Sequence, residues 1–450
     1  MRTAIEPTWV LSPEGLRSGV RVLVEDKLIV GVERADRHPD PGVPVRRMAH
    51  TLLMPGLVNA HSHAFQRAFR GHVQWRAGAR DDFWSWREAM YRAANALTPD
   101  GIEAVSRLAF LEMVEAGITH VGEFHYLHHQ TDGTRYDDPD ELARRVIAAA
   151  RSVGLRITLL RVVYGRSGAG LPANPLQQRF LDRDADDALA AASRLAKLDD
   201  PLVNVGLAPH SVRAVPPAWL RALADFAGPV HAHVSEQEAE NAACLAEVGL
   251  SPLQHLANSG LVHERFTAVH LTRPVEGDLA LARTARAMVC ACPTTELDLG
   301  DGLLPLDARL TLPICLGSDS QAAIDPWWEA RTLELHGRAQ ARARNVLAPM
   351  DERHGLARRL LTEPSAVGRR SLGVAPVAIE AGAPADLIAI RLDAPSAAGV
   401  PPLEAAAFAA HPNWVSDVWV AGREVVGDGR HADRDAIARA ALHYITSATA

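Results

Sequence analysis

Short apolar runs recur along the chain from residue 52 onward and alternate with amphipathic stretches rich in Ala, Leu and Arg. Eight runs have the near-continuous apolar character of parallel strands that are buried on both faces. They span residues 52–60, 119–124, 156–164, 203–209, 229–234, 266–271, 287–292 and 312–317. The intervening stretches 99–116, 139–153, 184–198 and 217–226 have the pattern of helices. This alternation predicts an α/β fold, a (β/α)8 barrel of the TIM type, with a doubly wound parallel sheet as the alternative.

The two ends of the chain have a different pattern, in which short β-type segments are separated by turns. These segments cover residues 20–24, 28–32, 386–391, 415–421 and 424–426. A helix at 350–361 follows the last barrel strand. We therefore expect residues 1–52 and 375–450 to form one small β-sandwich domain with a terminal helix, and residues 53–374 to form the barrel.

Composition and charge exclude several classes of protein. Apolar residues make up 48% and charged residues 22% of the 450 residues, which is typical of a globular protein. The net charge of −7 provides no basic field for nucleic acid or for an anionic membrane. No continuously apolar window of about 18 residues predicts a membrane span, and the first residues, MRTAIEPTWV, lack the apolar core of a secretory signal. The four cysteines form no CxxC pair, so we expect a reducing, cytoplasmic location and interpret Cys290 and Cys292 as buried core thiols.

Two histidines at i and i+2 follow the first predicted barrel strand. In an extended chain, His61 and His63 point to the same side, where two imidazoles can bind one metal ion. Other predicted strands also end in polar residues that are useful in catalysis: His210, His233 with Glu236, His270 and Asp319. Because the carboxyl ends of barrel strands converge on one face, we expect these side chains to form one active site. We interpret the remaining histidines at 125, 128, 129, 255, 336, 354 and 443 as solvated or structural residues.

The same strand ends carry a family resemblance. The segments MPGLVNAHSH, HAHVSE, AVH and GSDS resemble the amidohydrolase superfamily, and GAPADLIAI with VWVAGREVV resembles its small β domain. Within that superfamily, HSHAFQRAFRG and APHSVRAV resemble the N-formimino-L-glutamate deiminases. The resemblance implies hydrolysis of N-formimino-L-glutamate to N-formyl-L-glutamate and ammonia by a metal-activated water, a step of histidine degradation. It also implies a homodimer, because members of the superfamily are often dimers.

The resemblance also assigns roles to the residues that match the motifs. It implies one divalent metal ion, as a rule Zn2+, bound by His61, His63, His233 and Asp319. Glu236 and His270 become the catalytic acid/base pair, and Asp319 also takes a proton from the water. Many superfamily members bridge two metals with a carboxylated Lys at the end of the fourth strand, but the only lysines here are Lys27 and Lys197, which lie elsewhere. The composition therefore predicts a single metal.

The implied substrate is a small dianion with an amidine end, so its carboxylates need cationic partners. Five residues match the deiminase pattern of substrate binding: Gln66, Arg87, Tyr126, His210 and Arg213. Arg213 is the best candidate for a carboxylate clamp, because guanidinium groups bind carboxylates in bidentate fashion. Arg87 has a structural alternative, packing over a neighbouring Trp, and Gln66 could be an ordinary polar residue at a helix start.

Two other functions stay open at this point. One is a guanine-type or other cyclic-amidine deaminase with the same metal site, which would need aromatic stacking more than paired Arg residues. The other is a non-catalytic scaffold with an amidohydrolase fold, which the complete set of predicted ligands disfavours. The chain has no HExxH, GxSxG, P-loop or HxE…PCxxC signature, so the chemistry associated with those motifs is not predicted.

Overall fold

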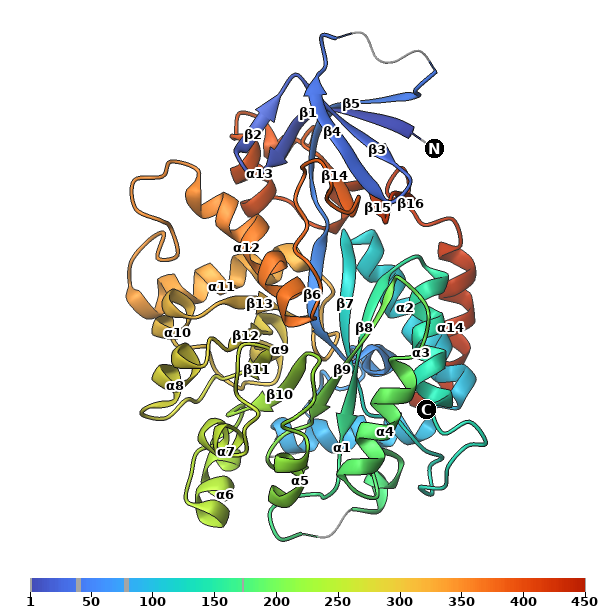
Figure 1. Ribbon diagram of the computed structural model, residues 1–450, viewed down its shortest axis with the longest axis vertical. Coiled ribbons are helices and arrows are strands. Elements are labelled where there is room, and N and C mark those ends of the chain that lie inside the picture. Colours follow the sequence, from blue (N-terminus) through green and yellow to red (C-terminus); the bar gives the residue numbers. More distant parts are fainter. Residues whose placement is uncertain (1, 38–41, 77–80, 172–173, 450) are drawn as a thin grey trace.

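The computed structural model describes residues 2–37, 42–76, 81–171 and 174–449 and shows a barrel with a second sheet at one end (Figure 1). The barrel sheet has eight strands in the order of the chain, so the predicted (β/α)8 fold is confirmed and the doubly wound alternative is wrong. Its strands are β6 (Leu57–Ser62), β7 (Ile118–His125), β8 (Arg156–Val163), β9 (Val203–Pro209), β10 (Val230–Val234), β11 (Phe266–His270), β12 (Met288–Ala291) and β13 (Ile314–Leu316). Every described neighbouring pair in this sheet is parallel.

The barrel closes where its first and last strands end. Ser62 and Asp319 form a parallel bridge outside the named ladders. Two backbone hydrogen bonds support it: His63 N donates to Asp319 O at 3.0 Å, and Asp319 N donates to His61 O at 3.0 Å. The seam of the barrel therefore runs through residues that the sequence predicts as metal ligands.

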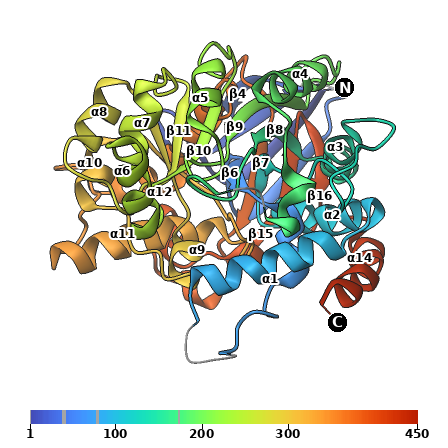
Figure 2. The ribbon, with the colours of Figure 1, turned by 90° about the horizontal axis from the view of Figure 1, so that it is seen from below.

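Helices surround the strands in the view from below (Figure 2). Those of the barrel are α1 (Phe83–Ala96), α2 (Pro99–Glu115), α3 (Glu141–Ser152), α4 (Ala185–Leu195), α5 (Pro217–Ala222), α6 (Glu238–Val248), α7 (Pro252–Asn258), α8 (Asp278–Thr284), α9 (Pro293–Asp298), α10 (Leu306–Thr311), α11 (Pro326–Ala341) and α12 (Gly355–Ser371), with the 3-10 helices η1 (Ala64–Phe69) and η2 (Pro175–Phe180). Local signals set several starts: Thr98 caps α2 by accepting from Gly101 N, and Pro99 occupies its first turn. The helix predicted at 350–361 begins later, at Gly355, and continues to Ser371.

The chain ends form the second sheet, as predicted. Its order is β16-β15-β14-β5-β1-β3-β4, with β2 paired to β1. Its strands are β1 (Arg2–Ser12), β2 (Gly15–Ser18), β3 (Val20–Glu25), β4 (Leu28–Arg34), β5 (Val45–Pro55), β14 (Leu387–Arg391), β15 (Val415–Val420) and β16 (Arg423–Val426). Buried side chains such as Val22, Leu53, Leu387 and Trp419 give this sheet a core of its own. The remaining helices are η3 (Pro395–Ala397), α13 (Pro402–Phe408), η4 (Pro412–Trp414) and the predicted terminal helix α14 (Arg434–Thr449).

The apolar run at 52–60, predicted as one barrel strand, is in fact two strands. Its first part belongs to β5, which pairs with β1 and β14 in the second sheet, and its second part is β6. The chain passes from one sheet to the other at Gly56, where a Cβ atom would overlap the side chain of Thr119. We therefore propose Gly56, in place of residue 52, as the boundary between the small domain and the barrel.

Replacing Gly56 with Ala is expected to destabilise the protein by about 1–3 kcal/mol, because the new methyl group must displace buried atoms of Thr119. Thermal or denaturant unfolding measures this loss. Gly31→Ala is the control, because a Cβ atom there would lie 3.7 Å from Leu23 Cδ1, an ordinary contact. Equal stability of the two variants would contradict a close approach of the two sheets at Gly56.

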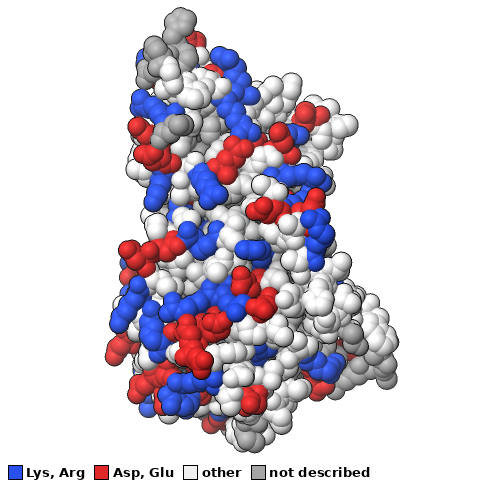
Figure 3. Space-filling model, turned by 90° about the vertical axis from the view of Figure 1, so that its right-hand side faces the viewer, with Lys and Arg blue, Asp and Glu red and all other residues white. Residues whose placement is uncertain are grey.

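The surface on the side of α2, α3 and α14 carries acidic and basic side chains in alternation (Figure 3). Arg145 is typical: its guanidinium lies 2.6 Å from Glu141 Oε1 and 2.5 Å from Asp100 Oδ1. Partly exposed pairs of this kind contribute little to stability, but they leave no single-sign field on this face. Among the described residues, none of the helices combines the length and the apolar character that crossing a lipid bilayer requires.

Candidate active site

The strand ends that carry the predicted polar residues lie at one end of the barrel, the end across which α1 lies (Figures 1 and 2). His61 is in β6, His233 in β10 and His270 at the last position of β11. His210 follows β9, and Asp319 follows β13. The carboxyl ends of the strands therefore bring residues from five parts of the chain to one place, as the barrel topology requires.

Four of these residues form a compact set of metal-ligating groups. One ligand atom from each of His61, His63, His233 and Asp319 lies within 4.8 Å of the others, and all four residues are buried. Asp319 Oδ1 is 3.2 Å from His61 Nε2 and 3.1 Å from His63 Nε2. These are the four residues that the family resemblance implies as metal ligands.

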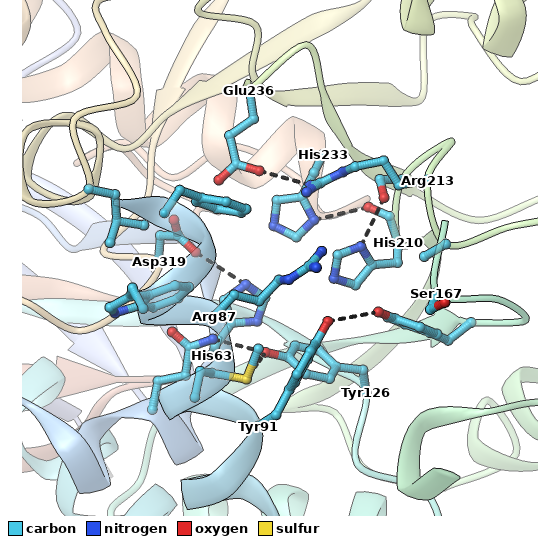
Figure 4. A pocket seen from close by; sticks show the side chains of 18 residues that line it. His63, Arg87, Tyr91, Tyr126, Ser167, His210, Arg213, His233, Glu236 and Asp319 are labelled. Carbon is cyan, nitrogen blue, oxygen red and sulfur yellow. Dashed lines mark hydrogen bonds and ion pairs between the residues drawn. The ribbon is translucent and has the colours of Figure 1, made fainter. Parts of the chain in front are cut away.

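The surroundings of the imidazoles suit a cation. His63 Nδ1 is 3.0 Å from Phe124 O, and His233 Nδ1 is 2.9 Å from His210 O, so each Nδ1–H donates to a carbonyl and each Nε2 lone pair points toward the cluster (Figure 4). Both ring nitrogens of His61 are buried, and apart from the 3.2 Å approach of Nε2 to Asp319 Oδ1 neither has a polar partner among the described residues. Burial lowers the pKa of His61 to about 3, so its ring is neutral. Three imidazoles and one carboxylate are a donor set that fits Zn2+, which binds nitrogen and oxygen ligands of this kind.

His270 is surrounded by carboxylates. Its Nε2 lies 3.7 Å from Glu236 Oε1 and 3.6 Å from Asp319 Oδ2, and its Nδ1 lies 3.4 Å from Glu296 Oε1. Burial disfavours the charged imidazolium, but Glu236, Glu296 and Asp319 outweigh it and raise the pKa of His270 to about 10. A proton on His270 is therefore available at the edge of the cluster.

Several of these strand ends have strained backbone. Ser235, His270, Leu271 and Asp319 have φ angles of 50°, 71°, 51° and 45°, in the left-handed region that favours glycine. Each such residue costs about 1–3 kcal/mol and persists only where its surroundings hold it. Backbone hydrogen bonds do so here, for example from Leu271 N to Val234 O at 3.0 Å. Sharp turns after the strands thus direct the side chains of His270 and Asp319 toward the cluster.

A small cavity opens above the cluster. His63, His233, Glu236 and Asp319 form part of its wall. All five residues predicted to bind substrate also line it: Gln66, Arg87, Tyr126, His210 and Arg213 (Figure 4). The structure therefore brings the predicted substrate-binding residues and the predicted metal ligands to one cavity.

The two arginines of the cavity have different partners. Arg213 Nη2 lies 3.0 Å from Glu236 Oε2, and its Nε lies 3.4 Å from Glu240 Oε1. Burial alone would lower the pKa of Arg213, but the charges of Glu240 and Glu236 raise it above its ordinary value. Arg87 stacks its guanidinium 4.5 Å from the ring of Trp84, as the structural alternative expected, yet it also reaches into the cavity (Figure 4). Its Nε is buried and has no hydrogen-bond partner among the described residues.

Some residues of the site were not predicted. Tyr164 directly follows β8 and Glu296 lies shortly after β12, so the rule that strand ends carry the site could have found both. Tyr91 lies one helical turn after Arg87 on α1, and this spacing is a signal that could have found it. Glu240 and Asp301 have no such signal. Burial and the nearby charge of Glu236 raise the pKa of Asp301 well above its ordinary value, so it is a neutral, buried acid beside the site.

The histidines at 125, 128 and 129 are buried, so a solvated loop is the wrong description of them. They are structural: His128 Nε2 is 3.1 Å from Val162 O, and His129 Nε2 is 2.9 Å from Leu181 O. The four cysteines are free and buried, which confirms the interpretation of Cys290 and Cys292 as core thiols.

Comparison with known proteins agrees with the geometry. The model of the amidohydrolase family matches residues 52–425. The formimidoylglutamate deiminase of Pseudomonas aeruginosa is 37% identical, over 98% of this chain and 99% of that relative. An amidohydrolase from Brucella melitensis has a TM-score of 0.90 and 34% identity, with 100% of each chain covered. An adenosine deaminase from Xanthomonas campestris with bound zinc has a TM-score of 0.82 and 26% identity, over 99% of this chain and 98% of that one. The cavity, the strand-end residues and the family match all lead to one conclusion: the chain belongs to the amidohydrolase family.

Proposed function

We propose that this protein hydrolyses N-formimino-L-glutamate to N-formyl-L-glutamate and ammonia. The observation that carries the proposal is the cavity itself, in which Arg87 and Arg213 lie above a buried cluster of three histidines and one aspartate. A dicarboxylate with one hydrolysable end matches this arrangement, because its carboxylates can bind the two arginines while its hydrolysable end faces the cluster. The relationship to the formimidoylglutamate deiminase of Pseudomonas aeruginosa over nearly the whole of both chains supports the same substrate.

We propose His61, His63, His233 and Asp319 as ligands of one divalent metal ion, with Zn2+ as the expected metal. Such an ion would supply Lewis-acid assistance and would lower the pKa of a water molecule. The support is the burial of all four groups within a small volume, where Asp319 is the one polar partner of the His61 ring among the described residues. Neither Lys27, a turn residue of the small domain after β3, nor Lys197, which follows α4, reaches the cluster, so one ion is proposed.

The protein side chains then divide the proton transfers. Asp319 and Glu236 accept the two protons of the attacking water, and Glu236 passes both in turn, its own and the one from Asp319, to the departing nitrogen so that it leaves as ammonia. His270 lies within 3.7 Å of Glu236 and donates to the oxygen where negative charge develops. Atoms balance, because the oxygen of water becomes the formyl oxygen and its hydrogens leave with the amidine nitrogen. The substrate-side roles of Gln66, Arg87, Tyr126, His210 and Arg213 are to bind and orient the dianion.

The test is ammonia release from formiminoglutamate, formiminoaspartate and guanine, measured side by side with one enzyme preparation. We expect fastest release from formiminoglutamate. Release from guanine alone would favour a cyclic-amidine deaminase. No release from any substrate, together with no bound metal, would favour a non-catalytic scaffold.

Replacing Arg213 with Met is expected to raise KM about ten- to a hundredfold, the effect of losing a charge-assisted carboxylate contact. The ion pair with Glu236 adds a second effect, because its loss frees that carboxylate, so a smaller decrease in kcat is expected as well. Steady-state kinetics separates the two parameters. Arg221→Met, on exposed helix α5, is the control. An unchanged KM in Arg213→Met would contradict the clamp.

Two further proposals concern the setting of the enzyme. The free, buried cysteines support a reducing, cytoplasmic location. The homodimer implied by the family resemblance stays a prediction, and analytical ultracentrifugation would measure it.

A further inference from the structure

Two tyrosines and a glutamine form a hydrogen-bonded group in the cavity wall. Tyr91 belongs to α1, Tyr164 directly follows β8, and Gln177 belongs to η2. Gln177 Nε2 lies 2.8 Å from Tyr91 Oη and 2.6 Å from Tyr164 Oη, and the two hydroxyl oxygens are 3.3 Å apart. All three residues are buried, and both tyrosines line the cavity beside Arg87 (Figure 4). The proposed reaction gives this group no role.

The orientation of the Gln177 amide is set by its backbone surroundings. Asn174 N lies 3.1 Å from Gln177 Oε1. Because a backbone N–H can only donate, Gln177 Oε1 must be the oxygen of the amide and not its nitrogen. The amide nitrogen therefore faces the tyrosines, and its two N–H groups donate to the two hydroxyl oxygens. Each hydroxyl accepts one hydrogen bond from Gln177 and keeps its own proton to donate.

The hydroxyls of Tyr91 and Tyr164 cannot both donate their protons to atoms of this group. One can lie in the 3.3 Å contact between Tyr91 Oη and Tyr164 Oη. No other acceptor for the second proton is found among the described residues that contact these hydroxyls. Tyr126, on the same cavity wall, differs: its hydroxyl accepts from Gln66 Nε2 at 2.9 Å and donates to Met90 Sδ at 3.5 Å. Because both tyrosines line the cavity, the spare proton of the Tyr91–Tyr164 pair can be donated to an acceptor that the ligand supplies.

The charges around the pair indicate which kind of acceptor. The guanidinium of Arg87 lies 5.6 Å from the ring of Tyr91, and the charges of Arg87 and Arg213 act on the Tyr164 hydroxyl. Burial nevertheless raises the pKa of Tyr164 well above its ordinary value, so its hydroxyl stays protonated. A phenol that keeps its proton beside a guanidinium with an unpartnered Nε favours an anion with at least two acceptor oxygens, as a carboxylate has.

We propose that the Tyr91–Tyr164 pair, held in place by Gln177, is a specificity element that donates one O–H hydrogen bond to the substrate carboxylate bound by Arg87. The proposal rests on the proposed function and adds to it the residues that distinguish a dicarboxylic formimino acid from a monocarboxylic one. Sites built to hydrogen-bond a substrate group reject analogues that lack it, because the buried donor is then left unpaired.

The test compares three substrates in wild type, Arg87→Met and Tyr91→Phe/Tyr164→Phe. The first substrate is formiminoglutamate. The second is the formimino derivative of γ-aminobutyrate, which lacks the α-carboxylate, and the third is the formimino derivative of α-aminobutyrate, which lacks the side-chain carboxylate. We expect the double Phe variant to lose about tenfold or more in kcat/KM for formiminoglutamate, mainly through KM. The analogue that is least affected by Arg87→Met should also be least affected by the double Phe variant. An equal loss for all three substrates would mean a merely structural role and would overturn the proposal.

Gln177→Glu provides a second variant of the same size. A carboxylate at this position would accept from both hydroxyls and turn their protons away from the ligand, so the same loss for formiminoglutamate is expected. Tyr444→Phe, on α14, is the control for hydroxyl removal away from the cavity. Full activity of Gln177→Glu on formiminoglutamate would contradict the proposed orientation of the hydroxyls.

Binding of glutarate, measured by calorimetry, separates this proposal from the proposed function. If the wild type does not deiminate formiminoglutamate but binds glutarate about tenfold tighter than the double Phe variant does, the proposed function fails and the specificity element stands. If the wild type deiminates formiminoglutamate and both proteins bind glutarate equally, the specificity element fails alone. Absence of both turnover and glutarate binding in the wild type would overturn both.

Discussion

Replacing Glu236 with Gln is expected to lower kcat by about 10²- to 10⁴-fold while bound metal stays at one ion per chain. The amide keeps the size of the side chain but cannot carry a proton from water to the departing nitrogen. Glu236 lines the cavity, and its Oε1 lies 3.7 Å from His270 Nε2, so the carboxylate is within reach of the reacting atoms without belonging to the four-residue metal cluster. Steady-state ammonia release and elemental analysis of the same sample measure the two quantities.

Glu238→Gln is the matched control for this experiment. Glu238 lies two positions further along the chain, and its side chain is 82% exposed and faces Arg273 at 3.3 Å. An exposed pair of this kind contributes little, so the control should keep full activity. Wild-type turnover in Glu236→Gln would remove this residue from the mechanism, whereas loss of metal would show that it acts as a ligand.

Replacing His233 with Ala is expected to abolish both metal binding and turnover. His233 supplies one of three imidazoles to the cluster, and its ring is oriented by the 2.9 Å contact between its Nδ1 and His210 O. Its removal leaves two imidazoles and a carboxylate, and the metal content should fall from about one ion per chain to near zero at micromolar metal. Because His233 lies in β10, away from the seam between β6 and β13, the barrel should still close.

The exposed His443 on α14 gives the control variant His443→Ala, which should bind metal and turn over substrate as the wild type does. Circular dichroism of both variants checks that they are folded. A His233→Ala variant that retains stoichiometric metal would show that the cation is bound elsewhere.

The barrel could be predicted because its strands are buried on both faces and therefore have continuous apolar runs. The run at 203–209 coincides with β9, and that at 156–164 with β8 to within one residue. The same signal fails at 52–60, because β5 is also buried at Leu52, Leu53 and Met54 although it belongs to the other sheet. An apolar run indicates that a strand is buried, but it does not indicate in which of the two sheets the strand lies.

The candidate site could be predicted where a residue type coincides with a strand end, as at His61, His233 and Asp319. Tyr91 and Gln177 lie instead on a helix and a 3-10 helix, and only the packing of these elements over the barrel end brings them to the cavity. The engagement of Arg213 with Glu240 likewise depends on the placement of α6. His128 Nε2 lies 2.6 Å from Arg161 Nη1, and Arg161 pairs with Asp182 at 2.5 Å, a contact between residues 21 positions apart that the sequence does not reveal.

The central claim is that His61, His63, His233 and Asp319 bind a single divalent ion. A crystal structure of the zinc-loaded protein, with anomalous diffraction recorded on both sides of the zinc edge, tests it most directly. The account predicts one anomalous peak per chain, about 2.0–2.1 Å from a nitrogen of each of the three histidines. Two peaks in the barrel, or one peak whose bonded atoms exclude these histidines, would contradict it.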